Sequence, residues 1–283
     1  MPIRVELPAT LRARLDAAKR PLIGLWACAG SPVTAEIVAG SGCDWVLLDA
    51  EHSPNGLESV LAQLYAMSAY PVAPLVRPPY GDTVTIKQFL DLGAQNLLIP
   101  MVDSAEQAEQ IVRAVRYPDG TAGGGVRGVG SALARSARWN RVEGYLGRAN
   151  ETISLTVQIE SAAAVADVER IVAVDGVDAI FVGPSDLAAS MGLLGQQGHP
   201  DVVENVLRAI RAGVAAGTPV GVNAFVPADA ERYLAAGASF VAVGADVALL
   251  ARQTEALVGR FAGDAGAGGA GDAGAAAEPR ASY

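Results

Sequence analysis

Several residue types that support common functions are scarce in this sequence of 283 residues. Its only cysteines, Cys28 and Cys43, lie in apolar contexts, which argues against a disulfide scaffold and favours a reducing cytoplasmic location. The net charge is −9 and no run of lysine or arginine occurs, so no nucleic-acid partner is expected. Lysine occurs only at Lys19 and Lys87, both in expected helices. A strand-end lysine that forms a Schiff base with a carbonyl substrate is therefore not expected.

Long apolar runs are also missing. Gly, Pro or a charged residue breaks each run well before the roughly 18 residues that a membrane span needs, so no membrane partner is expected. The first 21 residues alternate charge with leucine, which predicts a short amphipathic helix and no signal peptide. Residues 263–283 consist mainly of Gly and Ala. This segment has too little apolar surface to offset the cost of ordering it, so a disordered tail is expected there.

A weak internal repeat predicts the fold. In four segments a helix is expected to end at a glycine, which suits the left-handed C′ position, and an apolar strand follows. The four segments are SGCDWVLLD, LGAQNLLIP, DGVDAIFVG and AGASFVAVG, and their glycines are Gly42, Gly93, Gly176 and Gly237. Four more apolar runs lie between them: PLIGLWA, PVAPLVR, ISLTVQI and TPVGVNAF. Strands that alternate with helices in this number predict a single domain over residues 1–262, a closed, parallel (β/α)8 TIM barrel with an N-terminal helix.

The helices of the repeat are expected at Pro32–Gly40, Gly56–Ala66, Thr83–Leu92, Ser104–Val115, Ala162–Val172, Val202–Ala215, Pro227–Ala235 and Asp246–Phe261. One segment, Tyr117–Glu151, does not fit the repeat, and long loops in compact domains are usually functional or disordered. It contains GGGVRG, which matches G-x-G-x-x-G but does not follow a strand, so no nucleotide is expected. We expect this segment to be a flexible loop that brings Arg127 toward the mouth of the barrel.

Polar residues are concentrated just after particular strands, where barrels build their active sites. Asp49, Glu51 and His52 follow the second strand and Arg77 follows the third. The other candidates follow strands one, five and six: Trp26, Gln158, Glu160, Ser185 and Asp186. Taken singly, His52 is explained as a helix cap, Arg77 as a surface ion pair, Asp186 as a first-turn acid and Trp26 as packing. Their joint occurrence at neighbouring strand ends favours a site.

This set of residues predicts an enolate reaction. Glu160 and Asp186 suit a hard divalent cation that keeps several waters, namely Mg²⁺ or Mn²⁺, with Co²⁺ or Zn²⁺ as substitutes. Such an ion would chelate a 2-oxoacid, and the backbone N–H groups of Gly183, Ser185 and Asp186 would receive its remaining carboxylate oxygen. Arg77 would then stabilise the enolate oxygen, and His52 would move a proton.

The sequence resembles the metal-dependent (class II) pyruvate aldolases typified by 4-hydroxy-2-oxoheptanedioate aldolase, from about Leu22 to Leu257. The resemblance rests on GLWACAGSP, LLDAEHSPN, PLVRPP, IKQFLDLGAQNLLIPMV, RGVGSALARSARWN, VQIES and IFVGPSDLAASMG, in this order. It implies cleavage of a 4-hydroxy-2-oxoacid to pyruvate and an aldehyde through a metal-bound pyruvate enolate. Trp26 and Arg127, together with Cys28, would influence which aldehyde fits.

The resemblance also implies roles for individual residues. His52 is implied as proton acceptor, Arg77 as transition-state stabiliser, and Glu160 and Asp186 as metal ligands, while Gln158, Ser185 and Asp186 contact the 2-oxoacid. Asp91 is implied to raise the basicity of the histidine, although its place near the end of a helix puts it at the opposite end of its own barrel. We therefore expect it to reach His52 of a neighbouring subunit in a homo-oligomer, a hexamer by family resemblance. Asp49 is a second candidate partner for His52, from the same chain.

Two other functions stay open at this point. A lyase acting on a malyl- or citramalyl-type CoA thioester would use the same two carboxylates, but a CoA site should show basic residues for its phosphates, and lysine is scarce. A catalytically idle barrel that binds 2-oxoacids would be free to lose His52, Arg77, Glu160 and Asp186, all of which are present.

Overall fold

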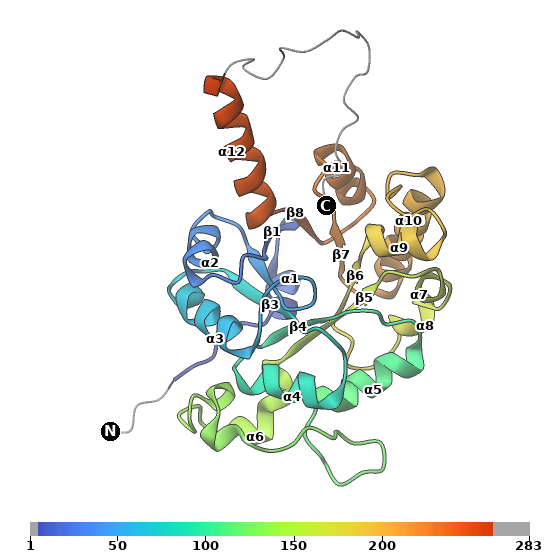
Figure 1. Ribbon diagram of the computed structural model, residues 1–283. Helices are drawn as coiled ribbons and strands as arrows, with labels where there is room; N and C mark the ends of the chain where they lie inside the picture. Colours follow the sequence, from blue (N-terminus) through green and yellow to red (C-terminus); the bar gives the residue numbers. More distant parts are fainter. Residues whose placement is uncertain (1–4, 263–283) are drawn as a thin grey trace, which may run out of the picture.

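The computed structural model describes residues 5–262, which form a closed barrel of parallel strands surrounded by helices (Figure 1). Each strand pairs with its neighbours in chain order, and β8 closes the barrel against β1. The strands are β1 (Leu22–Ala27), β2 (Trp45–Asp49), β3 (Ala73–Arg77), β4 (Asn96–Ile99), β5 (Ser154–Ile159), β6 (Ala179–Val182), β7 (Val220–Asn223) and β8 (Phe240–Ala245). The predicted (β/α)8 barrel is confirmed.

The helices lie close to their expected positions. They are α1 (Leu11–Ala17), α2 (Pro32–Ala39), α3 (Leu57–Ala66), α4 (Thr83–Asp91), α5 (Ala105–Val115), α6 (Tyr145–Arg148), α7 (Ala162–Ala166), α8 (Val168–Ile171), α9 (Pro184–Ser190), α10 (Pro200–Ala216), α11 (Pro227–Ala235) and α12 (Asp246–Ala262). The single helix expected over Ala162–Val172 is instead two, divided at Asp167, whose carboxylate accepts a hydrogen bond from the Ala105 N–H at 2.8 Å. Within residues 5–262, no helix has the length and apolar character to cross a membrane.

The glycines of the repeat adopt the backbone conformation that the pattern predicts. Gly42, Gly93, Gly176 and Gly237 have φ angles of 90°, 87°, 100° and 108°, which non-glycine residues rarely adopt. Each lies between a helix and the strand that follows it. These glycines therefore end the helices and allow the chain to turn into the next strand.

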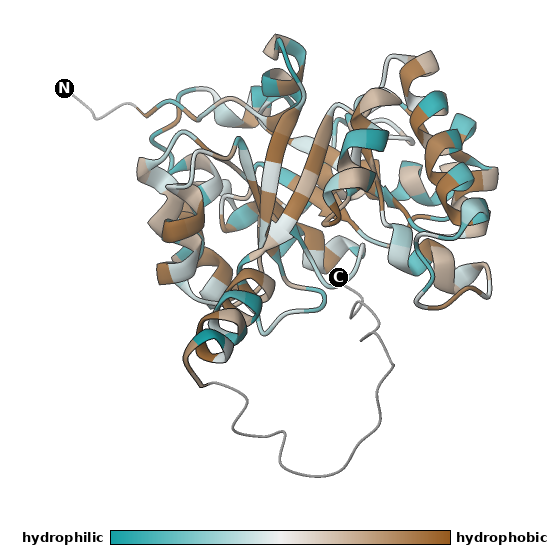
Figure 2. Cartoon of the chain, turned by 90° about the horizontal axis from the view of Figure 1, so that it is seen from above, coloured by the Kyte–Doolittle hydropathy of each residue, from teal (hydrophilic) through white to brown (hydrophobic). Residues whose placement is uncertain are grey.

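Two apolar layers stabilise the barrel. One fills the space between the strands and the outer helices, and the other fills the lumen. In the lumen, Trp45, Phe181 and Phe240 contact one another with ring centroids 5.6–6.1 Å apart. Seen from above, hydrophobic residues follow the central strands, as expected for strands covered on both faces (Figure 2).

Helix α1 closes the N-terminal end of the barrel. Leu11 is fully buried in the lumen cluster, and its N–H donates to Asn96 Oδ1 at 2.6 Å. The N–H of Arg12 donates to Ser154 Oγ at 3.2 Å. The lumen is therefore filled and closed from below, which leaves the C-terminal ends of the strands as the open face.

Helix α12 differs from the other long helices because it leaves the barrel. Figure 1 shows it projecting away from the strands. Asp246, its first residue, is its only buried residue, and apolar side chains along its length are exposed: Val247, Leu249, Leu250, Leu257, Val258 and Phe261. On β8, Val243 is also 38% exposed. The barrel thus has one exposed apolar residue on β8 next to a helix whose apolar side chains are mostly exposed.

The segment Tyr117–Glu151 is built from turns, short 3-10 helices and α6. It has a small apolar cluster of its own, formed by Ala137, Val142, Tyr145 and Ala149. It packs near the ends of α4 and α5, where the N–H of Arg127 donates to the Arg116 carbonyl at 3.0 Å. The tail predicted at 263–283 lies outside the described residues.

Candidate active site

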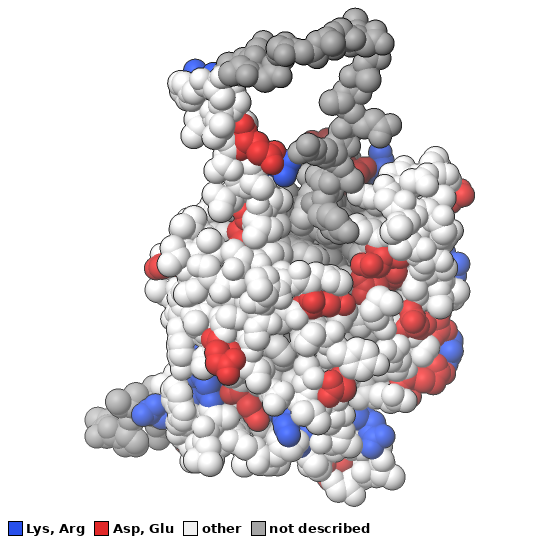
Figure 3. All heavy atoms as spheres, viewed as in Figure 1, with Lys and Arg blue, Asp and Glu red and all other residues white. Residues whose placement is uncertain are grey.

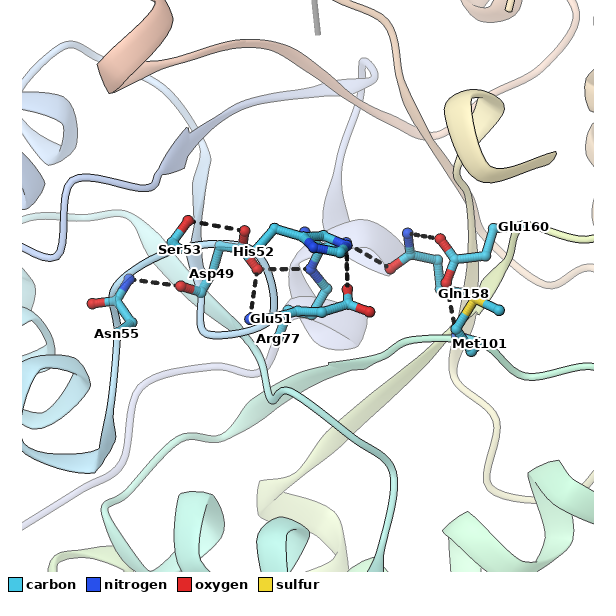
Figure 4. A network of polar contacts seen from close by, with 9 residues as sticks. All are labelled: Asp49, Glu51, His52, Ser53, Asn55, Arg77, Met101, Gln158 and Glu160. Atoms are coloured by element: carbon cyan, nitrogen blue, oxygen red, sulfur yellow. Dashed lines mark hydrogen bonds and ion pairs between the residues drawn. The ribbon is translucent and has the colours of Figure 1, made fainter. Parts of the chain in front are cut away.

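Side chains from several strand ends meet in one hydrogen-bonded network at the open face of the barrel. Asp49 ends β2, Arg77 ends β3, and Gln158 and Glu160 lie at the end of β5. Figure 4 shows Arg77 between the loop after β2 on one side and the β5 residues on the other. The strand register places Asp49 directly beside Arg77, which explains why their side chains meet.

Arg77 is the centre of this network. Its side chain is only 2% exposed, and its Nε donates to Asp49 Oδ1 at 2.8 Å. Its Nη1 lies 2.9 Å from Glu51 Oε2 and 3.5 Å from Gln158 Oε1. Although burial alone would raise it, the hydrogen bond and charge of Arg77 hold the pKa of Asp49 below its ordinary value. The buried guanidinium is therefore paired, and it is fixed by groups from both sides of the mouth.

Glu160 is a buried acid with an unusual environment. One of its oxygens accepts the Met101 N–H at 2.7 Å, and the other accepts a hydrogen bond from Gln158 Nε2. Burial raises the pKa of Glu160 to about 7; the Met101 N–H opposes the rise, and the charge of Asp186 adds to it. Met101 has a φ of 54°, a costly conformation for this residue, and it aims the N–H at the carboxylate. A buried carboxylate whose pKa is raised in this way is suited to bind a cation.

Asp186 and its neighbours form the other half of the candidate cation site. Asp186 is exposed in the first turn of α9, and Ser185 is half-buried beside it. Gly183 lies against Glu160, because a Cβ at Gly183 would stand 2.8 Å from Glu160 Oε2. The charge of Asp186 acts on Glu160, and two neighbouring carboxylates are the donor set that suits a hard divalent ion. Within residues 5–262, no cluster of three or more His, Cys, Asp or Glu forms a more complete metal cage.

One predicted contact at this site is wrong. The N–H of Gly183 was expected to bind the substrate carboxylate, but it donates to the Ile159 carbonyl at 3.1 Å. This bond continues the pairing of β5 with β6, and Pro184 has no N–H to offer. Of the three predicted backbone donors, only Ser185 and Asp186 remain candidates, and the contribution of Gly183 is the space that its missing side chain leaves.

His52 stands at the mouth with its side chain 65% exposed. Its Nε2 lies 3.6 Å from Glu51 Oε2. The expectation that Asp49 is its partner within the chain is not met, because the oxygens of Asp49 accept from Arg77, Ser53 and the Glu51 N–H. Glu51 therefore connects the imidazole to Arg77. Burial raises the pKa of Glu51, while the charges of Arg77 and His52 oppose that rise.

Trp26 and Cys28 line the β1 side of the site. The Arg77 guanidinium lies 4.6 Å from the centre of the Trp26 ring, and Trp26 meets Phe225 edge to face at 6.0 Å. Burial raises the pKa of the Cys28 thiol to about 11, so it stays protonated and does not serve as a nucleophile at neutral pH. The Asp246 carboxylate fixes the loop after β1 by accepting the N–H of Cys28 at 2.8 Å and of Ala29 at 3.1 Å.

Asp91 and Arg127 lie at the other end of the barrel. Asp91 ends α4, just before β4 begins, and its Oδ1 accepts from Arg127 Nη2 at 3.0 Å. The Arg127 side chain is fully buried and stacks on Tyr117, with its guanidinium carbon 4.4 Å from the ring centre. The prediction of a flexible loop that carries Arg127 to the mouth of its own barrel is therefore wrong. Asp91 cannot reach His52 of the same chain, as its helix position predicts.

The sequence pattern did not assign roles to Glu51, Met101 or Asp246. Glu51 was visible as one of three polar residues after β2, but nothing in the sequence distinguishes it from Asp49 as the partner of His52. Met101 and Asp246 contribute through a backbone N–H and a loop contact, which only the fold reveals.

Comparison with known proteins gives a consistent result. Residues 22–253 match the family model described as HpcH/HpaI aldolase/citrate lyase. The chain is 55% identical over 242 residues to a hydroxypyruvate/pyruvate aldolase of Deinococcus radiodurans, covering 86% of each protein. It is 50% identical over 247 residues to a 4-hydroxy-2-oxo-heptane-1,7-dioate aldolase of Salmonella dublin, covering 86% of this chain and 91% of that protein.

A solved structure supports the same assignment. The crystal structure of an HpcH/HpaI aldolase/citrate lyase family protein from Burkholderia cenocepacia has a TM-score of 0.85 at 40% identity. The match covers 89% of this chain and 99% of that one. The predicted resemblance is confirmed.

Replacing Asp49 by Asn is expected to lower the free energy of unfolding at neutral pH by about 2 kcal/mol, because Arg77 loses a charged, buried partner. The folded pKa of Asp49 is depressed, so its contribution is present above the unfolded pKa of about 3.9 and is lost as pH falls through the folded value. Urea unfolding of parent and variant should therefore differ at neutral pH and converge in acid. Asp16→Asn, which alters an exposed ion pair with Arg12, is the control and should change little. A difference that persists unchanged in acid would contradict this account.

Proposed function

The chain belongs to the HpcH/HpaI aldolase/citrate lyase family, and on that premise we propose that it cleaves a 4-hydroxy-2-oxoacid reversibly to pyruvate and an aldehyde. It is a carbon–carbon lyase. The observation that carries this proposal is the position of Arg77. It lies between the loop after β2, which holds the acids and the exposed His52, and the Gln158–Glu160 pair. This arrangement provides a base, a fixed positive charge and a candidate cation site at one mouth. The names of the two relatives support pyruvate as the common product.

A divalent cation held by Glu160 and Asp186 fits the residues present, with Mg²⁺ or Mn²⁺ favoured and Co²⁺ or Zn²⁺ as alternatives. Burial raises the pKa of Glu160, and the charges of Asp186 and Glu51 add to the rise against the Met101 N–H and Arg77. A bound cation would offset these effects by stabilising the carboxylate. When bound, the ion acts as a Lewis acid that polarises a 2-oxoacid carbonyl. Two protein carboxylates leave the other ligand positions to water and substrate, as Mg²⁺ sites usually do.

The chain's own residues divide the remaining work. Gln158 and Ser185 flank the cation site, and they orient the 2-oxoacid. His52, exposed at the mouth, accepts the proton of the C4 hydroxyl as the C3–C4 bond breaks. The electrons of that bond pass into the pyruvate enolate, whose negative oxygen Arg77 stabilises. Because Arg77 is already paired and buried, it needs little reorganisation when the charge develops.

The active enzyme is proposed to be a homo-oligomer, a hexamer by resemblance, with sites shared between subunits. On helix α12, Leu250 and Leu257 are 62% and 59% exposed. A row of exposed apolar side chains of this kind usually marks a surface that binds another protein. Most of the visible surface of α12 is uncharged (Figure 3). The helix of one copy would cover the exposed Val243 of β8 in another. In such an assembly Asp91 of one subunit would approach His52 of its neighbour and raise the basicity of the imidazole.

A second copy would also bring Asp91 and His52, which lie far apart within one chain, into one site.

The two free cysteines favour a reducing compartment such as the cytoplasm for this assembly.

Replacing His52 by Ala is expected to lower kcat about 10²–10⁴-fold, because a positioned base contributes this much, while KM changes little. The assay follows pyruvate release from a panel of 4-hydroxy-2-oxoacids and one citramalyl-type CoA thioester, whose cleavage also yields pyruvate, with added Mg²⁺ or Mn²⁺. A chelator should abolish the parent's activity, and added metal should restore it. His199→Ala, which removes the only other histidine from the exposed start of α10, should keep full turnover. Release from the thioester alone would overturn the proposed substrate class.

Replacing both Leu250 and Leu257 by Glu is expected to dissociate the oligomer, because charges placed in an apolar interface cannot be solvated there. Light scattering after size exclusion measures the mass. Gln253→Glu adds a charge to the same helix at an exposed polar position and should leave the assembly intact. An unchanged mass for the double variant would show that α12 does not form the interface.

Mixing inactive His52→Ala subunits with inactive Asp91→Asn subunits tests the sharing of sites. If each site takes His52 and Asp91 from different subunits, random assembly should restore about a quarter of the sites. Turnover is compared between co-refolded mixtures and each variant refolded alone. If both groups acted within one chain, the mixture would stay as inactive as its components.

A further inference from the structure

We propose that the N-terminal face of the barrel carries an anion site, formed by Arg14, Arg135 and Arg138, that takes a phosphate or carboxylate group. The three arginines line a cavity of about 160 Å³ between α1, the end of α3 and the starts of β3 and β4. Arg135 and Arg138 belong to the conspicuous segment RGVGSALARSARWN, and neither takes part in the hydrogen-bonded network at the catalytic site. The cavity lies at the end of the barrel opposite to Glu160 and His52, so the proposal does not depend on the aldolase function.

The positive charge in this cavity is not neutralised. The Nη1 atoms of Arg135 and Arg138 both crowd Gly93, because a Cβ there would meet them at 2.8 Å and 2.9 Å. Their guanidinium groups donate to carbonyl oxygens: Arg135 to Leu92 and Leu64, and Arg138 to Arg135. In the described part of the chain no carboxylate forms an ion pair with either group. Burial, together with the like charge of Arg138, lowers the pKa of Arg135 to about 10. An anion would relieve both effects.

Backbone strain marks the same place. Among described residues other than glycine, only Met101 and the run Arg138, Trp139 and Asn140 have positive φ angles. Met101 uses its strained backbone to hold Glu160 at the catalytic site. The φ angles of 49°, 53° and 64° at the three consecutive residues fix the backbone that carries Arg138 toward Gly93. Strain of this kind persists where a function or a tightly packed structure requires it, and here it gathers two like charges.

The remaining donors define the ligand. Arg14 Nη1 donates to the Pro71 carbonyl at 2.8 Å, but its Nε is buried with no hydrogen-bond partner among the described residues. Arginine has five N–H donors in a planar fork that matches carboxylate and phosphate oxygens. Three such forks around one small cavity fit a compact anion with several oxygens. The anion comes either from solution, as phosphate or a short dicarboxylate, or from an acidic side chain of a second copy of this chain.

The test titrates the full chain with phosphate, and separately with malonate, by calorimetry at a constant ionic strength set with chloride. We expect saturable binding that the double variant Arg135→Gln, Arg138→Gln weakens about tenfold or more, because charged hydrogen bonds are lost. Arg14→Gln is the milder variant, used if the double variant does not fold, and should weaken binding in the same direction. Arg141→Gln is the matched control, since Arg141 is an exposed arginine that directly follows the segment and lies outside the cavity.

The outcomes separate the two sources of the anion. Weakened phosphate or malonate binding in the double variant, with Arg141→Gln unchanged, supports a free anion. No binding by the parent, combined with a smaller oligomer for the double variant alone, supports an acidic side chain of a second copy. Equal binding by parent and double variant overturns the site. So does the absence of binding together with an unchanged mass.

Discussion

The buried Arg77 guanidinium is the interaction on which the rest of the site depends. A charge removed from water in this way is very costly unless partners surround it, and here Asp49 and Glu51 supply opposite charge while Gln158 lies alongside. These partners come from strands on both sides of β3. The pairing therefore fixes the loop that presents His52, and through Gln158 it also fixes the carboxylate of Glu160. The buried Arg77 guanidinium thus positions the proposed base and the candidate metal ligand together.

The two ends of the barrel carry local charge of opposite sign. At the open end, Glu160, Asp186 and Glu51 bring excess negative charge close to a single buried arginine, which favours a divalent cation. At the closed end, Arg135 and Arg138 lie close together without an acid partner, which favours an anion. Arg127 at the same end is different, because its Nη2 pairs with Asp91. The protein is acidic overall, so this local excess of positive charge is not a consequence of composition.

The projecting helix α12 links the proposed assembly to the mouth of the barrel. Its first residue, Asp246, accepts the backbone N–H groups of the loop that follows β1 at the mouth, while its last turns contact no other part of the described chain closely enough to be buried. A partner that orders this helix would also order the wall of the site that holds Cys28. The proposed assembly would thereby be coupled to the proposed site through one carboxylate.

The sequence by itself determined the barrel, because a helix-ending glycine followed by an apolar run is a local pattern that recurs along the chain. It also predicted that His52, Arg77, Glu160 and Asp186 lie at the same end of the barrel, because the C-terminal ends of parallel strands meet there. It did not determine which acid faces which cation. Asp49 and Glu51 are two residues apart and chemically alike, and only the strand register decided that Asp49 takes Arg77 Nε while Glu51 lies by His52. Likewise the tertiary structure decided that the Gly183 N–H is used in the sheet and that Arg127 is buried beside Asp91. These outcomes depend on distances between segments far apart in the sequence, and no local pattern encodes such distances.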